Sequence, residues 1–277
     1  MDNDTTTHGK LDEKSGTNLH PLAAPNLAIF QCPSNPVAVG SNGKNSMVYN
    51  NGMYHRGRTS YVRSQSKQNG IGVQKWGRFK SSETVTLDDL KDGQGFTVII
   101  SENVQALPWH RAGFANRSVL TNTNAANIDW QSARYTNGMV WHYEDPLVSQ
   151  TPNNFWNKSN LFTENRMDED DTKGPKAPAD IVNVVPASVS SFHKINGGGS
   201  TVSDDIFNKT LEPDNAANLA RPSSAHVDGV NCGFADGATR FVVSSINYRV
   251  YQAMMTPRGK SSLVPYPEFV LTDELGN

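Results

Sequence analysis

Apolar and polar residues alternate most regularly from residue 230 to residue 243, on either side of the pair Asp236-Gly237. Such a pair favours a two-residue turn with positive φ at both positions, so the stretch predicts a β-hairpin. In the resulting register Phe234 pairs with Thr239 and Cys232 pairs with Phe241. One face of the hairpin should then be buried, with Arg240 directed away from it, and this face consists of Val230, Cys232, Phe234, Phe241 and Val243.

Shorter patterns predict further elements of a sheet. Residues 96–101 form an uncharged, β-branched run that is typical of a central strand, and residues 138–143 indicate another strand. Residues 27–30 form a short apolar run, which Pro33 would end as a strand. Thr86 and Asp89 have the spacing of a capping box, so residues 86–90 should form one helical turn.

A helical stripe follows the hairpin, because Ile246, Val250 and Met254 recur at intervals of four residues. Ser244 or Ser245 can cap the start of this helix, and the helix should pack back on the sheet. These elements together predict an α+β fold, pilin-like in outline, with a central antiparallel sheet, short helices and long loops. We expect the helix and the loops to cover the sheet, so that no large apolar patch stays exposed.

The pattern also divides the chain. Residues 1–26 have few large apolar side chains and predict a flexible lead-in. Residues 27–277 then form a single α+β domain with a long loop excursion at about residues 105–175. No stretch approaches the roughly 20 apolar residues of a membrane span, and the polar opening residues do not resemble a signal peptide.

Composition limits the class of protein further. Of the 277 residues 36% are hydrophobic and 19% are charged, a balance typical of a β-rich, loop-heavy exterior protein. The formal net charge of −2 provides no field that would attract a polyanion, which argues against a nucleic-acid partner.

The two cysteines, Cys32 and Cys232, leave two interpretations open. They are either unrelated small buried residues or one long-range disulfide, which an oxidising exterior would permit if the Cα atoms lie within about 7 Å. A zinc site built locally is not indicated, because no histidine lies at ligand spacing from either cysteine.

Three separate stretches share one family pattern. His226 precedes Asp236-Gly237 by nine intervening residues, and Arg221 opens the same stretch. Upstream, Cys32 lies in the run Phe-Gln-Cys-Pro-Ser-Asn-Pro, and Asp92-Gly93 leads through a β-branched run to Ser-Glu at Glu102. Jointly these motifs resemble a large bacterial family of unknown function with a His-x9-Asp-Gly signature, over roughly residues 28–260. Members of that family typically begin with a prepilin-type cleavage/methylation segment.

This resemblance implies a pilin-like, exported protein that assembles at the cell surface, with protein partners and no known catalytic activity. In the family a hydrophobic N-terminal helix comes first, and the polar opening here is consistent with a truncated chain or with a divergent member that lost its anchor. This chain should then be a monomer, whereas the anchored form would assemble through the helix.

The remaining candidates for chemistry have structural interpretations that we favour. Asp236 and His226 would lie about 30 Å apart on an extended strand, so Asp236 should make the turn and His226 should bond to backbone. Glu102 could be a ligand or an acid, but a carboxylate paired with an arginine at the strand end is favoured. A thiol site made of Cys232 and His226 is disfavoured, because Cys232 would face the apolar side.

No nucleophile elbow, metalloprotease or dinucleotide motif occurs, so we predict no catalytic, cofactor or metal residues. Three functions remain open: a non-enzymatic pilin-like subunit or adaptor of a surface or secretion assembly, which we favour, a glycan- or protein-binding β module, and a hydrolase with a loop-built site. Exposure of Trp130, Trp141 or Trp156 in a row would favour the binding module.

Overall fold

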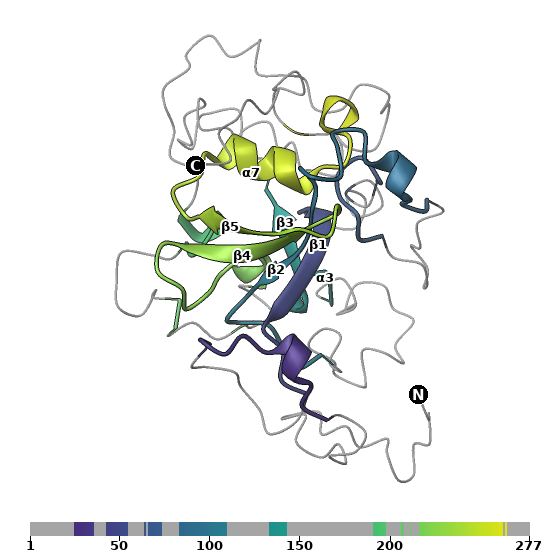
Figure 1. The fold of residues 1–277 in the computed structure, drawn as a ribbon. Helices are drawn as coiled ribbons and strands as arrows, with labels where there is room; N and C mark the ends of the chain where they lie inside the picture. Colours follow the sequence, from purple (N-terminus) through teal and green to yellow (C-terminus); the bar gives the residue numbers. More distant parts are fainter. Residues whose placement is uncertain are drawn as a thin grey trace, which may run out of the picture.

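The computed structural model describes residues 25–35, 43–54, 64, 66–73, 83–109, 133–142, 191–197, 206–207, 211, 216–262 and 264. Its centre is one sheet with the strand order β3-β1-β2-β4-β5 (Figure 1). The strands are β1 (Met47–Met53), β2 (Val98–Glu102), β3 (Gly138–Trp141), β4 (Gly229–Phe234) and β5 (Thr239–Val243). The α+β class is confirmed, but the sheet is mixed rather than antiparallel, because β3 runs parallel to β1.

Short helices surround this sheet. They are η1 (Ala28–Phe30), η2 (Leu87–Asp89), α3 (Ala133–Thr136), η6 (Ser191–His193), α6 (Ala216–Leu219), α7 (Tyr248–Met255) and η8 (Gly259–Ser261). The capping box at η2 is confirmed, since the Thr86 backbone N–H donates to the Asp89 carboxylate at 3.0 Å. The predicted strand at residues 27–30 is wrong. Gln31 N–H instead donates to the Ala28 carbonyl at 3.0 Å and closes the 3-10 turn of η1.

The strand predicted at residues 96–101 is confirmed as the central one. β2 pairs antiparallel with β1 on one side and with β4 on the other. The β-branched run that marks this strand thus has neighbours on both edges, as its lack of charge suggested.

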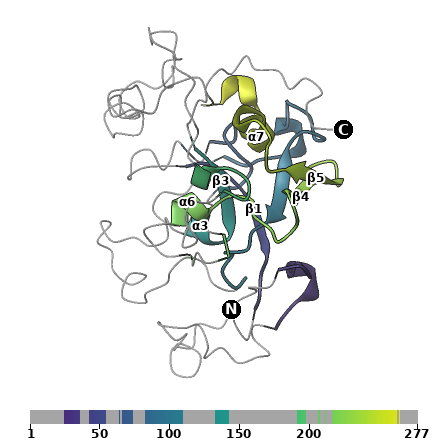
Figure 2. The ribbon, with the colours of Figure 1, turned by 90° about the vertical axis from the view of Figure 1, so that its left-hand side faces the viewer.

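The helix after the hairpin packs on one face of the sheet, as predicted (Figure 1). Val250 and Met254 of α7 belong to the same buried cluster as Val48 of β1 and Val230 of β4. The predicted cap is wrong, because the helix begins later: Asn247 is the N-cap and its side chain accepts from Arg249 N–H. α3 and α6 form a second, smaller cluster beside β3 (Figure 2).

The hairpin forms, but its predicted register is wrong by one residue. Gly237 alone takes positive φ, at +84°, and Phe234 N–H bonds to the Ala238 carbonyl, so the loop has three residues rather than two. β4 and β5 therefore pair Asn231 with Phe241 and Cys232 with Arg240.

This shift exchanges the two faces of β5. Val242 is buried, whereas Phe241 and Val243, both expected in the core, are exposed. Arg240, expected on the far side, lies over the Phe234 ring, with its guanidinium carbon 4.4 Å from the ring centroid. Val230, Cys232 and Phe234 of β4 are buried as predicted.

The face of the sheet opposite α7 keeps large apolar side chains in contact with solvent. Tyr49 pairs with Ile100, and Ile100 pairs with Gly233, so these positions share one face across β1, β2 and β4. Phe241 and Val243 continue it on β5, because Gly233 pairs with Thr239. We call this the open face, and its exposed side chains are Tyr49 (47%), Ile100 (38%), Phe241 (50%) and Val243 (44%). These side chains are each partly exposed, while most of the loops expected to cover the sheet lie outside the described residues, so the expectation that they cover it stays a prediction.

Several predictions fall outside the described residues. The flexible lead-in lies there except for its last two residues, and the long excursion is described only at residues 105–109 and 133–142. Among the described residues, no helix has both the length and the apolar character that crossing a bilayer requires.

Candidate functional site

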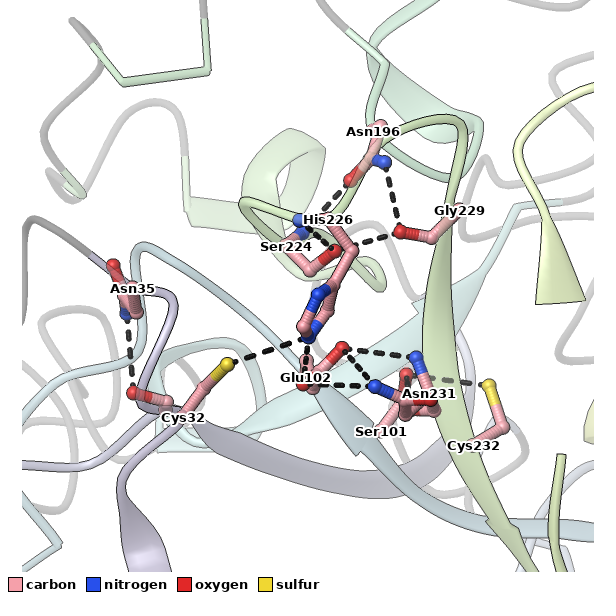
Figure 3. Close-up of polar contacts among 11 residues, drawn as sticks. Cys32, Asn35, Ser101, Glu102, Asn196, Ser224, His226, Gly229, Asn231 and Cys232 are labelled. Carbon is pink, nitrogen blue, oxygen red and sulfur yellow. Dashed lines mark hydrogen bonds and ion pairs between the residues drawn. The ribbon is translucent and has the colours of Figure 1, made fainter. Parts of the chain in front are cut away.

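Three of the family-pattern residues, far apart in the sequence, meet beside the end of β2. Cys32 follows η1, Glu102 is the last residue of β2, and His226 lies in the loop that leads to β4 (Figure 3). Since Glu102 alternates with Ser101, it points to the same side of the sheet as Ile100. The site therefore lies on the side that carries the open face.

The donor atoms of these three residues converge on one region. His226 Nε2 lies 3.1 Å from Glu102 Oε1 and 3.6 Å from Cys32 Sγ. All three donor atoms lie within 4.8 Å of one another. Cys32 and Glu102 are buried, and His226 is half-buried. A sulfur, an imidazole nitrogen and a carboxylate oxygen thus share one partly enclosed site.

Glu102 is held from both ends. Its Oε2 accepts from the Asn231 backbone N–H at 2.9 Å, and its backbone carbonyl accepts from Ser223 N–H at 2.9 Å. The side-chain amide of Asn231 lies 3.4 Å from both carboxylate oxygens. The predicted pairing of Glu102 with an arginine is wrong, because a histidine and a strand amide take that place.

The loop that carries His226 is fixed by short polar contacts (Figure 3). Asn196, at φ +54°, accepts from Ser224 N–H at 2.8 Å. The Ser224 hydroxyl donates to the Gly229 carbonyl at 2.6 Å and accepts from His226 N–H at 3.1 Å. The prediction that the His226 side chain bonds to backbone is wrong: its ring nitrogen contacts Glu102 and Cys32 instead.

Cys32 begins a tight turn. Asn35 N–H donates to the Cys32 carbonyl at 3.0 Å, and the Asn35 side chain donates to the Ser46 hydroxyl next to β1 at 3.1 Å. Burial, together with the nearby Glu102 carboxylate, raises the pKa of the Cys32 thiol, while backbone N–H groups of Ser34 and Asn35 act in the opposite direction. The net direction is upward, the opposite of the lowered pKa that activates a cysteine nucleophile.

Cys232 lies on the other face of the sheet. It pairs with Arg240 and faces the core, and its thiol donates to the Ser101 hydroxyl at 3.3 Å. Burial raises its pKa to about 12. Both cysteines are free, so the disulfide considered from the sequence does not form, and the buried-residue interpretation holds for Cys232. The thiol beside His226 belongs to Cys32 and not to Cys232.

The other pattern residues have structural roles. Arg221 is buried and donates to the Gly197 carbonyl, and burial lowers its pKa to about 10. Asp92 accepts from Gly259 N–H, and Gly93, at φ +104°, begins the turn that leads into β2. Asp236 makes the hairpin turn as predicted, accepting from Ala238 N–H at 2.9 Å and pairing with Arg240 at 2.7 Å, and Gly237 supplies its positive φ.

The geometry does not suit a nucleophilic triad. In such a triad one ring nitrogen faces the nucleophile and the other faces the orienting carboxylate. Here His226 Nε2 faces both Cys32 and Glu102. Three donors around one region are instead the kind of arrangement that can share a proton or surround a cation.

Ligand spacing along the chain does not reveal this site, because its three residues are distant in the sequence. His226 is 194 residues from Cys32 and 124 residues from Glu102. One signal was present: each residue comes from a different one of the three stretches that carry the family pattern.

An exposed row of tryptophans, which would favour a binding module, does not include Trp141, because Trp141 is fully buried. Trp130 and Trp156 lie outside the described residues.

The fold and the site therefore define an α+β protein with a five-stranded mixed sheet and a Cys–Glu–His cluster at the end of its central strand. The chain belongs to the family described as "Protein of unknown function (DUF1559)", whose model matches residues 1–249. No curated protein and no solved structure matches the chain. The family pattern inferred from the sequence lies almost wholly within the matched range.

Proposed function

We propose that this protein is a non-enzymatic, pilin-like exported protein that acts as a subunit or adaptor of a surface or secretion assembly. The observation that carries the proposal is the open face, where Tyr49, Ile100, Phe241 and Val243 are all more than a third exposed. Export and surface location rest on the resemblance to a family with a prepilin-type segment.

The open face is suited to a protein partner for a physical reason. Its four side chains lie on one face of the sheet: Tyr49 and Ile100 are neighbours through the pairing of β1 with β2, and Phe241 and Val243 lie on β5, beyond β4. Leaving apolar surface in water costs about 25 cal/mol per Å², which a partner recovers by covering it. β5 is also one of the two edge strands of the described sheet, so an interface here can extend along its edge.

A role without catalysis is supported by the site itself. Burial and Glu102 raise the pKa of the Cys32 thiol, and one histidine nitrogen faces both neighbours. Neither feature favours acyl transfer or general-base chemistry. A purely structural or assembly role requires neither.

The experiment places a photo-cross-linking amino acid at position 241 in cells that produce the protein. We expect a discrete cross-link to a protein of the same exported assembly, identified by mass spectrometry, and protection of position 241 from external labelling only when that assembly is present. The matched control is position 87, where Leu87 is an equally apolar and exposed residue outside the sheet. Equal cross-linking at both positions, or a cytoplasmic location on fractionation, would contradict the proposal.

Purified alone, the chain should remain a monomer in light scattering, because the partner rather than a second copy covers the open face. Concentration-dependent oligomers that disappear in Phe241→Ser but persist in Leu87→Ser would assign the open face to self-association instead.

A further inference from the structure

We propose that Cys32, Glu102 and His226 form a zinc-binding site that joins three distant segments of the chain. The inference is independent of the assembly role, because it rests on donor atoms and not on the open face.

The spacing of the donors fits one tetrahedral ion. Zinc lies about 2.3 Å from sulfur and about 2.0–2.2 Å from nitrogen and oxygen, which places tetrahedral S and N ligands about 3.6 Å apart and N and O ligands about 3.4 Å apart. The observed separations are 3.6 Å from Cys32 Sγ to His226 Nε2 and 3.1 Å from His226 Nε2 to Glu102 Oε1. These two separations differ from the tetrahedral values by at most a few tenths of an ångström, and all three donor atoms lie within 4.8 Å of one another.

Supporting hydrogen bonds aim the donors. The backbone N–H of Asn231 holds Glu102 Oε2 at 2.9 Å, which leaves Oε1 directed at His226. Backbone N–H groups of Ser34 and Asn35 face the Cys32 sulfur. The Ser224 hydroxyl fixes the backbone of His226. Outer partners of this kind orient the ligands of metal sites.

The donor set selects the class of metal. A thiolate with an imidazole is a poor site for Ca²⁺ or Mg²⁺, which take oxygen ligands, and a suitable site for Zn²⁺. Three protein ligands leave a fourth position, which water fills in such sites. On binding, zinc replaces the thiol proton, which is released to solvent, and no oxidation or reduction takes place.

A bound ion would cross-link three segments of the chain. Cys32 precedes β1, Glu102 ends β2 and His226 precedes β4, so one ion would tie together segments up to 194 residues apart. Because the folded chain binds and the unfolded chain lacks the assembled site, zinc should raise the temperature of unfolding.

The test uses the full chain without an affinity tag, treated with a chelator, desalted and kept reduced. Zinc is titrated in competition with a chromophoric chelator. We expect one Zn²⁺ per chain, and a loss of affinity of at least about 100-fold in Cys32→Ser and in Glu102→Gln, because removing a direct ligand should cost at least as much as removing an outer partner. The matched control is Cys232→Ser, since the second free thiol faces the other side of the sheet and should leave binding unchanged.

Cobalt provides a second readout that does not depend on a variant folding. Co²⁺ bound to the unmodified chain should show a thiolate-to-metal charge-transfer band, which persists in Cys232→Ser and is absent in Cys32→Ser. Zinc should also raise the unfolding temperature of the unmodified chain and of Cys232→Ser. Failure to bind zinc, cobalt bound without a charge-transfer band, or equal affinity in the two cysteine variants would each overturn the proposal.

Discussion

At the scale of single residues, buried asparagines connect strands of the sheet to segments outside it. The Asn50 side chain is fully buried and donates to the Val98 carbonyl of β2 and the Met255 carbonyl at the end of α7, at 2.9 and 2.8 Å. Asn103 donates in the same way to the Leu219 and Arg221 carbonyls. These asparagines therefore serve the interior, where each side-chain amide donates to two backbone carbonyls.

A second residue-scale feature is a stack of aromatic rings on the buried His142. The His142 and His193 rings stack with centroids 3.4 Å apart, and Tyr54 stacks on His142 at 4.6 Å. His142 Nε2 lies 3.1 Å from the Ala217 carbonyl, which requires the neutral ring to donate there. Burial, and then the neighbouring His193, hold the pKa of His142 well below 6.5.

This burial predicts a pH dependence of stability. The unfolded chain takes up a proton on His142 near pH 6.5 that the folded chain does not accept, so the free energy of unfolding should fall as the pH drops below about 6.5. One such proton contributes at most about 1.4 kcal/mol per pH unit. Denaturant unfolding between pH 7.5 and 5 should show this slope, and His142→Gln should reduce it.

The carboxylates act in a different range. Hydrogen bonds lower the pKa of Asp89, through Lys67 and Thr86, and of Asp236, through Ala238 and Arg240, from 3.8. Their contributions to the free energy of unfolding are present above about pH 4 and are lost below it.

For His142, an unchanged slope of the free energy of unfolding in His142→Gln between pH 6.5 and 5 would show that another group causes the pH dependence.

At the scale of elements, the hairpin of β4 and β5 sets which residues enter the core. Its three-residue loop ends in Gly237, and this single extra residue decides that Val242 and not Phe241 faces α7. Gly229 gives a further reason for the observed register, because a side chain there would contact the Phe241 ring. The hairpin therefore keeps a large aromatic ring on the open side of β5.

The register makes a quantitative prediction about two neighbouring residues. Val242→Ala should lower the free energy of unfolding by about 1.5–3 kcal/mol, because it removes buried methyl groups and leaves a cavity. Phe241→Ala should cost less than about 1 kcal/mol, because half of that side chain is already in contact with solvent. Urea unfolding of the two variants measures both values. A larger loss in Phe241→Ala than in Val242→Ala would restore the register of a two-residue turn.

At the scale of the whole molecule, one cluster connects all five strands to α7. It includes Val48 of β1, Val98 of β2, Met139 of β3, Val230 of β4, Val242 of β5 and Met254 of α7. Since no strand has a core of its own, we expect thermal unfolding to be one cooperative transition that is seen at the same temperature by far- and near-ultraviolet circular dichroism. Two separated transitions would show that residues 27–277 form more than one domain.

Elements whose causes are local can be predicted from neighbouring residues alone. The structure contains four such elements, each of which follows from neighbouring residues. They are the β-branched run of β2, the capping box of η2, the Asp236-Gly237 turn and the apolar stripe of α7. The pattern of Cys32, Glu102 and His226 was likewise visible as a family resemblance, although not as a site.

Tertiary structure decided the rest. The hairpin register depends on the number of residues in its loop. Both possible registers alternate apolar and polar residues, and the pairing of β4 with β2 and the packing against α7 determine which register forms. The parallel pairing of β1 with β3 and the meeting of Cys32, Glu102 and His226 depend on contacts between distant segments. A local pattern contains no information about such contacts, since they are stabilised only when the whole sheet has formed.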